Sequence, residues 1–524
     1  MRARTFRPPP RLAALLALLC IAPLRAGADV RPDPEWYRSA VIYGVVPPRF
    51  GPEPLKAVTA RLDALRDLGV DALWLAPVNP TDDPGDVSYA ITDYFGLRAD
   101  FGTPEDLRAL VREAHARGIR VLLDFVPNHT SVGHPHHLDA AARGRASPWW
   151  GWYDRDPAGR ETHYFDWKHL PNLDYGNPLV RQMMLDAFAF WVREYDVDGF
   201  RVDAAWGIRQ RAPAFWGALR RRLDAVKPGV FLLAEASARD PFYVRNGFDA
   251  AYDWTGELGH WAWEKVFDDP ARIGPALDAA LASRRTPMHR VARFLNNNDT
   301  GERFVTRHGL AVTRVAAVLL HALPGIAVVY TGDEVGAEFQ PYEEGPPVSW
   351  VDVHGLRPLY RRLAALREDL PALRRGTYRR VAVPGHPEAF AFLRDAGAAG
   401  RALVVLNFGG PARLRLDAPA GALPGWDAIS QRPAAVRRAG PGALELEVGG
   451  QQALILVDRA SPRRARPTPP PTPGRSPPAA CRARDAGRGG RRPASTRPPS
   501  SRRRPTRRSR RWASARPGTP GSRR

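Results

Sequence analysis

Short apolar segments alternate with longer amphipathic ones through most of this chain. The short segments are rich in β-branched and aromatic residues, which is typical of buried strands. In the longer segments apolar residues recur three and four positions apart, as in 55–68, which predicts helices. The strands that this pattern predicts are 40–46, 70–75, 119–125, 196–204, 230–234, 248–252, 291–295 and 326–330.

Strands that alternate with helices indicate βαβ units and a parallel sheet, so the expected fold class is α/β. Eight such strands within residues 40–330 favour a closed (β/α)8 barrel, the TIM-barrel fold. The alternative is an open doubly wound sheet. That fold would carry a Gly-rich phosphate loop after its first strand, and this sequence has none there.

Two regions depart from the barrel pattern. Residues from about 130 to 175 are irregular and rich in His, Trp and Gly, which predicts a small insert after the third strand. From residue 376 the chain changes to short strands divided by Gly and Pro. We therefore expect a catalytic barrel at 29–375 and a C-terminal antiparallel β-sandwich at 376–459. The strands expected in the second domain are 379–383, 389–394, 403–408, 414–417 and 444–457.

The net charge of +22 belongs almost entirely to the C-terminal end of the chain. Residues 460–524 contain 20 Arg and one Asp, so the remainder is close to neutral and nucleic-acid binding is not expected of it. This end consists mostly of Pro, Arg, Ser and Gly and lacks the apolar residues that a core needs. We interpret it as a disordered Pro/Arg-rich tail or as sequence read in a shifted frame.

The N-terminus has the pattern of a secretory signal peptide at residues 1–28. Several Arg precede the apolar run 12–22, and the small-residue motif Ala-Gly-Ala follows at 26–28. The apolar run is too short to span a bilayer, so we expect a secreted or periplasmic protein without stable membrane insertion. The two cysteines, Cys20 and Cys481, lie outside both expected domains, so no disulfide is expected within them.

Acidic residues follow three of the expected strands. In a parallel barrel the C-terminal ends of the strands meet at one mouth, and active sites lie there. Asp203, Glu235 and Asp299 follow the fourth, fifth and seventh strands, so we expect them to converge. Arg201 lies two residues before Asp203 and therefore on the same face of its strand.

Converging carboxylates repel one another, which raises the pKa of at least one of them. An isolated Arg-x-Asp is more often a structural ion pair, but here Arg201 favours an ionised Asp203 that is suited to be a nucleophile. Glu235 follows apolar residues and has no cation within two residues, so we expect it to keep its proton. A protonated acid beside an ionised one is what cleavage of a glycosidic bond requires.

Four motifs lie at these strand ends: Asp124-Phe-Val-Pro-Asn128-His129, Gly199-Phe-Arg201-Val-Asp203-Ala204, Ala234-Glu235 and Phe294-Leu-Asn-Asn-Asn298-Asp299. They resemble the signature regions of the α-amylase superfamily of glycoside hydrolases (glycoside hydrolase family 13). Segments 170–174 and 323–334 are similar to two further motifs of that family, in its insert and at its eighth strand. The resemblance covers about residues 35–459, with the motifs in the family's order.

The resemblance implies a retaining mechanism and a role for each strand-end residue. Asp203 would be the nucleophile, Glu235 the general acid/base and Asp299 the stabiliser of the transition state. Arg201 would orient the nucleophile, and Tyr89 would stack on the sugar that is cleaved. The substrate-binding residues that it implies are Arg201, His129, Asn298 and Tyr89.

The chain departs from the family pattern at two positions. The family usually has His where this chain has Asn298, and an amide can donate a hydrogen bond to a sugar there but cannot carry charge. The family often has Lys-His three residues after the nucleophile, where the His carbonyl binds calcium, but this chain has Trp206-Gly207. Asn128 remains a candidate calcium ligand, a single oxygen where calcium takes six or more. No organic cofactor is expected.

We therefore expect a secreted retaining glycoside hydrolase that cleaves α-1,4-glucosidic bonds in starch, maltodextrins or related α-glucans. A transglycosylase or a disaccharide-acting α-glucosidase of the same fold is one alternative, because the sequence does not place the residues that hold the other sugars. A non-catalytic carbohydrate-binding protein is an alternative of another class, and the presence of all three carboxylates argues against it. The expected partner is the α-glucan substrate, and the sequence predicts no oligomeric state.

Overall fold

The structure is a computed structural model that describes residues 35–458, apart from 84, 256–257, 283–285 and 418–424. The signal peptide and the tail predicted from the sequence lie outside the described residues. Within the described part of the chain, no helix combines the length and the apolar character that crossing a membrane would require.

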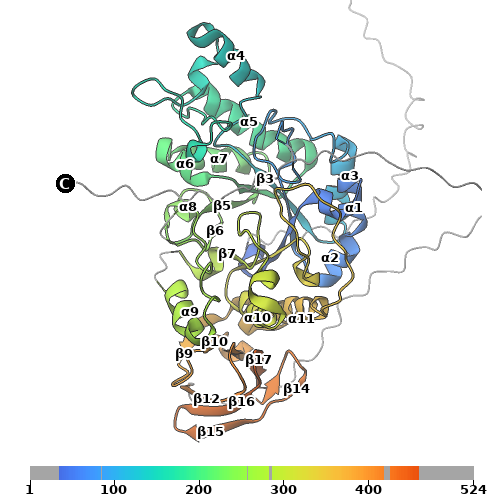
Figure 1. Ribbon diagram of the computed structural model, residues 1–524, viewed down its shortest axis with the longest axis vertical. Helices are drawn as coiled ribbons and strands as arrows, with labels where there is room; N and C mark the ends of the chain where they lie inside the picture. The colour runs from blue at the N-terminus through green and yellow to red at the C-terminus, as the bar shows by residue number, and fades with distance from the viewer. Residues whose placement is uncertain (1–34, 84, 256–257, 283–285, 418–424, 459–524) are drawn as a thin grey trace, which may run out of the picture. The chain divides into compact units, whose positions relative to one another are not determined.

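Eight parallel strands close into a barrel in the order β1 to β8 (Figure 1). The ring closes where β1 pairs with β8, from Val41 opposite Ala327 to Gly44 opposite Tyr330. All eight predicted strands are present, which confirms the TIM-barrel fold. Their bounds are β1 Val41–Val45, β2 Ala72–Leu75, β3 Arg120–Phe125, β4 Gly199–Val202, β5 Phe231–Ser237, β6 Ala250–Tyr252, β7 Val291–Phe294 and β8 Ile326–Tyr330.

The α-helices form where the sequence carries the helical pattern and its caps. Helix α3, Pro104–His115, is capped by Thr103, whose side chain accepts from the Asp106 N–H while the Asp106 carboxylate accepts from the Thr103 N–H, a capping box. The single helix expected at 55–68 is two helices, because the Arg61 N–H bonds to the carbonyl of Val58 only three residues back. The bounds are α1 Pro54–Ala60, α2 Leu62–Leu68, α3 Pro104–His115, α4 Pro135–Arg143, α5 Pro178–Tyr195, α6 Ala205–Arg211, α7 Phe215–Asp224, α8 Phe242–Arg245, α9 Ile273–Leu281, α10 Phe304–Ala322, α11 Arg357–Asp369 and α12 Pro371–Arg375.

Alternate strand residues fill the barrel and cover its outside. Ile42, Trp74 and Leu122 belong to a buried cluster inside the ring, whereas Tyr43 and Leu73 join the larger core between strands and helices. This alternation follows from the period of two along a strand. Packed apolar side chains thus fill the interior of the barrel. Polar side chains lie at the C-terminal ends of its strands.

The insert between β3 and α5 carries α4 and short 3₁₀ turns. An isolated bridge joins His129, just after β3, to Asn172 and fastens the insert to the end of β3, and a second bridge joins Tyr153 to Leu173 within the insert. Residues of the insert therefore border the mouth of the barrel.

The C-terminal strands form two antiparallel sheets, one of six strands and one of three, with an apolar cluster between them. This confirms the β-sandwich. The single strand expected at 444–457 is wrong, because Gly449, Gly450 and Gln451 turn the chain and Gln451 adopts a φ of 47°. The bounds are β9 Thr377–Val381, β10 Ala389–Asp395, β11 Arg401–Asn407, β12 Ala412–Asp417, β13 Trp426–Asp427, β14 Arg432–Pro433, β15 Val436–Gly440, β16 Ala443–Val448 and β17 Gln452–Val457.

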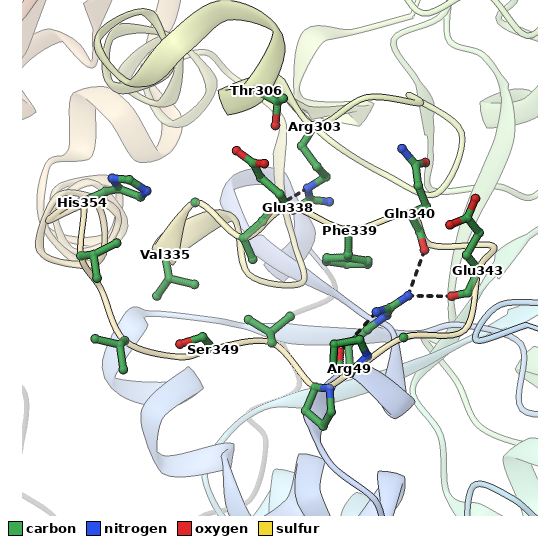
Figure 2. A pocket seen from close by; sticks show the side chains of 18 of the residues that line it. Arg49, Arg303, Thr306, Val335, Glu338, Phe339, Gln340, Glu343, Ser349 and His354 are labelled. Atoms are coloured by element: carbon green, nitrogen blue, oxygen red, sulfur yellow. Dashed lines mark hydrogen bonds between the residues drawn. The ribbon is translucent and has the colours of Figure 1, made fainter. Parts of the chain in front are cut away.

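The segment between β8 and α11 lines a cavity of about 680 Å³ (Figure 2). Arg49 projects into it and donates to the carbonyls of Gln340 and Glu343 at 3.1 and 2.6 Å. Arg303 donates to the Asp333 carboxylate at 2.6 Å. Protein groups already bind both cations, so these hydrogen bonds join the segment to the barrel. None of the strand-end acids lines the cavity.

Candidate active site

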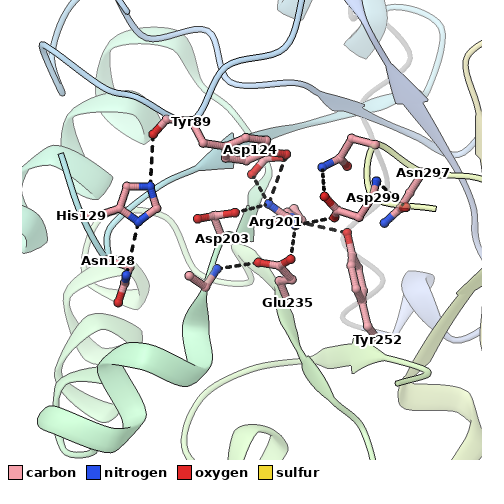
Figure 3. A network of polar contacts seen from close by, with 12 residues as sticks. Tyr89, Asp124, Asn128, His129, Arg201, Asp203, Glu235, Tyr252, Asn297 and Asp299 are labelled. Atoms are coloured by element: carbon pink, nitrogen blue, oxygen red, sulfur yellow. Dashed lines mark hydrogen bonds and ion pairs between the residues drawn. The ribbon is translucent and has the colours of Figure 1, made fainter. Parts of the chain in front are cut away.

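The ends of β3, β4, β5 and β7 bring four acidic side chains around one arginine at a single mouth of the barrel (Figure 3). The arginine is Arg201. The structure thus brings together the three acids singled out from the sequence and adds a fourth. The four acids are Asp124, Asp203, Glu235 and Asp299.

Arg201 is completely buried at the centre of this group. Its Nη1 donates to Oδ1 of Asp124 and to Oδ1 of Asp203, both at 2.9 Å. Its Nη2 lies 3.0 Å from Oε1 of Glu235 and 4.0 Å from Oδ2 of Asp299. One planar guanidinium therefore fixes the positions of Asp203 and Glu235 relative to each other.

Two further contacts hold Arg201 and its neighbour in place. Its Nε donates to the hydroxyl of Tyr252 at 3.1 Å. Asp124 accepts from the hydroxyl of Tyr89 at 2.9 Å and from Nε1 of Trp74 at 3.1 Å. Asp124 is thus bonded on both oxygens, and it holds Tyr89 at the edge of the group.

Glu235 has a cation close to it in space, although it has none close in sequence. The Nη2 of Arg201 pairs with one oxygen, and the N–H of Ala204 donates to the other at 2.6 Å. Burial nevertheless raises the pKa of Glu235 to about 7, with Asp299 acting in the same direction and Arg201 against it. A carboxyl group of this kind keeps its proton up to neutral pH.

Asp203 differs from the expectation that Arg201 keeps it ionised. Burial raises its pKa well above the usual range, and the charge of Glu235 adds to this, while Arg201 opposes both. The sequence shows only the cation two residues away, whereas Glu235 and Asp124 face Asp203 from the neighbouring strands. Asp203 and Glu235 therefore lose their protons as one coupled pair. The buried Oδ2 of Asp203 has no hydrogen-bond partner among the described residues.

Asp299 is the most exposed of the four acids. Its Oδ1 accepts from the hydroxyl of Tyr342 at 2.7 Å and from Nδ2 of Asn298 at 3.0 Å. The same amide nitrogen lies 2.9 Å from the Tyr342 hydroxyl. Asn298 thus lies at the mouth, and its contact with a sugar stays a prediction.

His129 lies next to Tyr89 and is fully buried. Its Nε2 is 3.2 Å from the Tyr89 carbonyl, and its Nδ1 is 3.2 Å from Nδ2 of Asn128. These partners fit a ring that donates from Nε2 and accepts at Nδ1. Burial lowers the pKa of His129 to about 3, so the ring is neutral. Its contact with substrate stays a prediction, and the contact that the structure shows is to Tyr89.

The surroundings of Asn128 do not fit calcium. Its side-chain oxygen accepts from Nη2 of Arg211 at 2.6 Å, so a guanidinium lies where the metal would bind. Its amide nitrogen donates to Oδ1 of Asn172 in the insert at 3.0 Å. Within the described residues, no three His, Cys, Asp or Glu side chains are grouped so that they could hold a metal ion. Asn128 therefore serves as a hydrogen-bond link, and no step is derived through calcium.

Tyr252, Tyr342 and Arg211 contact the site residues, although the sequence pattern does not single them out. Tyr252 ends a predicted strand, and that position could have indicated it. Arg211 is the last residue of α6, and basic residues are common in the last turn of a helix, so its position alone gives no signal of a role in the site. Tyr342 lies in an irregular segment, where periodicity gives no signal.

Comparisons with known proteins agree with this arrangement. The alpha-amylase catalytic domain family matches residues 51–352. Alpha-amylase MalA from Haloarcula japonica is 32% identical over 346 residues, which are 65% of this chain and 50% of that protein. The intracellular maltogenic amylase of Bacillus subtilis is 28% identical over 346 residues, 59% of this chain and 58% of that one. The chain thus spans about half the length of these curated relatives.

Solved structures show the same fold. The debranching enzyme of Nostoc punctiforme has a TM-score of 0.68 at 22% identity and covers 80% of this chain and 98% of that one. The cyclic alpha-maltosyl-(1→6)-maltose hydrolase of Arthrobacter globiformis has a TM-score of 0.66 at 25% identity and covers 81% and 99%.

Proposed function

Because this chain belongs to the alpha-amylase family, we propose that it hydrolyses α-1,4-glucosidic bonds in α-glucans such as starch and maltodextrins, with retention of configuration. The proposal rests on one observation. The guanidinium of Arg201 contacts the carboxyl group of Asp203 through Nη1 and that of Glu235 through Nη2. Retaining glycosidases require two carboxyl groups held close together, one as nucleophile and one as acid.

In the first step Asp203 attacks and Glu235 donates a proton. The free Oδ2 of Asp203 forms a bond to the anomeric carbon, while the bond from that carbon to the glycosidic oxygen breaks. Glu235 protonates that oxygen, and the leaving sugar departs with a complete hydroxyl group. Asp299 and the remaining carboxylates stabilise the positive charge that develops at the anomeric carbon.

In the second step the roles of Glu235 reverse. The ionised Glu235 removes a proton from water, and the water oxygen bonds to the anomeric carbon as the ester to Asp203 breaks. Glu235 is protonated again by this transfer, and the released sugar keeps its α-configuration. Arg201 remains bound to both carboxyl groups and prevents them from drifting apart.

The relatives' names support an α-glucan as the substrate. Those described as alpha-amylase and maltogenic amylase act, by name, on this class of polymer. The test is product analysis on maltoheptaose, starch and pullulan, with proton NMR of the first-formed anomer. The proposal expects short maltooligosaccharides released as the α-anomer. Release of the β-anomer, or no cleavage of any of the three, contradicts it.

We also propose that the protein is exported from the cytoplasm, which rests on the signal-peptide pattern of residues 1–28 alone. The maltogenic amylase of Bacillus subtilis is named as intracellular, so the relatives give no support for export. N-terminal sequencing of the protein from cell fractions is the test. A mature chain that starts near Asp29 outside the cytoplasm supports export, and an intact N-terminus inside the cell contradicts it.

A further inference from the structure

Arg49 binds a loop that ends at the mouth of the barrel. It lies in the turn that follows β1 and is only 3% exposed. Its Nη1 donates to the carbonyl of Pro346 at 3.2 Å, and its Nη2 donates to those of Gln340 and Glu343 at 3.1 and 2.6 Å (Figure 2). Three hydrogen bonds thus connect one buried guanidinium to residues 340–348, which we call the 340–348 loop.

The same guanidinium binds a second loop, the one between β2 and α3. Its Nε lies 2.5 Å from Oδ2 of Asp86, and both side chains are buried. The two loops also pack directly on each other, because a Cβ added to Gly85 would lie 2.6 Å from the carbonyl oxygen of Tyr342. Arg49 therefore joins the two loops where their backbones meet.

Each of these loops carries a tyrosine that contacts an acid of the site. Tyr89, in the β2–α3 loop, donates to Asp124 at 2.9 Å. Tyr342, in the 340–348 loop, donates to Asp299 at 2.7 Å. The centroids of the two tyrosine rings are 6.3 Å apart. The junction at Arg49 thus lies behind a pair of tyrosines that face the mouth.

The β2–α3 loop has anchors of its own near Tyr89. Nε2 of His129 lies 3.2 Å from the Tyr89 carbonyl, and Nη2 of Arg98 donates to the Gly85 carbonyl at 3.2 Å. These contacts do not involve Arg49. The β2–α3 loop therefore provides a fixed side against which the other loop is held.

Arg49 holds the 340–348 loop on both sides of Tyr342. It binds the carbonyl of Gln340, two residues before the tyrosine, and that of Glu343, the residue after it. A hydrogen bond weakens steeply when its donor shifts, so the bond from the Tyr342 hydroxyl to Asp299 requires this loop to stay in place.

Resting on the proposed function, we propose that Arg49 is a positioning residue for the cleavage reaction. It holds the 340–348 loop against the β2–α3 loop and thereby keeps the Tyr342 hydroxyl bonded to Asp299. That bond fixes the carboxylate which stabilises the charge at the anomeric carbon. Arg49 itself contacts protein groups and acts on the reaction through Tyr342.

The test is a double-mutant cycle between Arg49→Met and Tyr342→Phe in the full chain, with kcat for maltotriose as the readout. Each single variant should lower kcat about tenfold, because each removes the bond to Asp299. The double variant should also be about tenfold slower than the wild type, because the second change finds no bond left to remove. Independent effects, including a general loss of folded protein, would multiply to about a hundredfold.

Gly85→Ala tests the same junction without removing a charge. Its Cβ would meet the Tyr342 carbonyl and displace the 340–348 loop. This variant should lower kcat about tenfold, and adding Tyr342→Phe should lower it no further. It decides the question if Arg49→Met does not fold, since loss of Arg49 leaves the buried Asp86 without its cation. Thermal unfolding of each variant measures folding.

Arg61→Met is the matched control. The guanidinium carbon of Arg61 lies 3.8 Å from the ring centre of Trp350, two residues beyond the 340–348 loop. This variant removes an arginine from the same segment but leaves the junction with Asp86 intact. It should keep the wild-type kcat, and it should leave the effect of Tyr342→Phe unchanged.

The outcomes separate the two proposals. If Arg49→Met or Gly85→Ala folds and keeps the wild-type kcat, Arg49 has no positioning role and the proposed function stands. A double variant about a hundredfold slower than the wild type also overturns the positioning role, because Arg49 and Tyr342 then act independently. If the wild type cleaves none of maltotriose, starch and pullulan, the proposed function itself fails.

Discussion

The guanidinium of Arg211 is hydrogen-bonded to the side-chain oxygen of Asn128 at 2.6 Å. Asn128 in turn donates to Asn172, so this contact joins α6, the end of β3 and the insert. Burial lowers the pKa of Arg211, and the nearby acids Asp154 and Asp174 oppose that effect. The guanidinium of Arg211 thus occupies the position from which a calcium ion would contact the side-chain oxygen of Asn128.

We therefore expect a chelator to leave the melting temperature and the activity unchanged. Added calcium should raise neither of them. Arg211→Met should destabilise the protein by about 2 kcal/mol, because it removes a charged hydrogen bond from a buried acceptor. Differential scanning calorimetry with and without chelator measures both effects.

Arg209→Met on the same helix is the control for this prediction. Arg209 is partly exposed and pairs with Asp240, so its loss should cost under about 1 kcal/mol. A melting temperature that falls on chelation, or rises with calcium, would show that Asn128 belongs to a metal site.

Two substrates that differ in their leaving group, maltotriose and α-maltosyl fluoride, separate the roles of Asp203 and Glu235. Asp203→Asn should reduce turnover of every substrate by at least about a thousandfold, because the amide cannot act as the nucleophile. Glu235→Gln should abolish cleavage of maltotriose but retain the first step with α-maltosyl fluoride, which needs no proton. Burst kinetics with the fluoride measure that step. If Glu235→Gln fails equally on both substrates, Glu235 is not the acid.

The pH dependence of kcat/KM should reflect the coupled acids. Glu235 must be protonated to act as the acid, and its pKa is raised to about 7, so activity should fall as the pH rises through about 7. Asp203 must be ionised, and its pKa is raised too, so the acid limb should lie above the ordinary range of an aspartate.

Asp299→Asn tests the cause of this profile. The charge of Asp299 raises the pKa of Glu235, so its removal should move the basic limb to lower pH. The measurement is kcat/KM for maltotriose against pH in both proteins. A basic limb that stays in place, or moves to higher pH, would contradict the electrostatic assignment.

Tyr342→Phe should lower kcat about tenfold while the melting temperature stays nearly constant. The hydroxyl donates to Asp299 and lies beside the amide of Asn298, and a hydrogen bond to a charged group is worth about 1.5–3 kcal/mol. Tyr342 is 45% exposed and the variant keeps its ring, so little stability should depend on the hydroxyl. A wild-type kcat for this variant would show that Asp299 does not need the tyrosine.

The sequence predicts the barrel well because each strand is a short apolar run with a helix after it. It also places Asp203, Glu235 and Asp299 at one mouth, since parallel strands end on the same side. These conclusions need only local pattern and topology. The division of the helix at Arg61 and the turn at Gln451 escape the pattern, because both depend on backbone geometry at single residues.

Contacts between distant residues account for what the sequence does not show about the site. The pKa of Asp203 depends on Glu235, 32 positions away in the chain, as well as on Arg201 beside it. The bond from Tyr342 to Asp299 spans 43 positions and starts in a segment without periodicity. Spacing along the chain gives no measure of such distances.

The four acids around Arg201 also make the mouth selective by charge. With a proton on Glu235, the carboxylates of Asp124, Asp203 and Asp299 face a single positive charge, so the mouth carries an excess of negative charge. Phosphate esters or uronic acids next to the scissile bond would meet repulsion that the poorly solvated walls strengthen, whereas plain glucose units would not. With the activity on starch that we propose, phosphorylated stretches should therefore survive digestion as limit fragments.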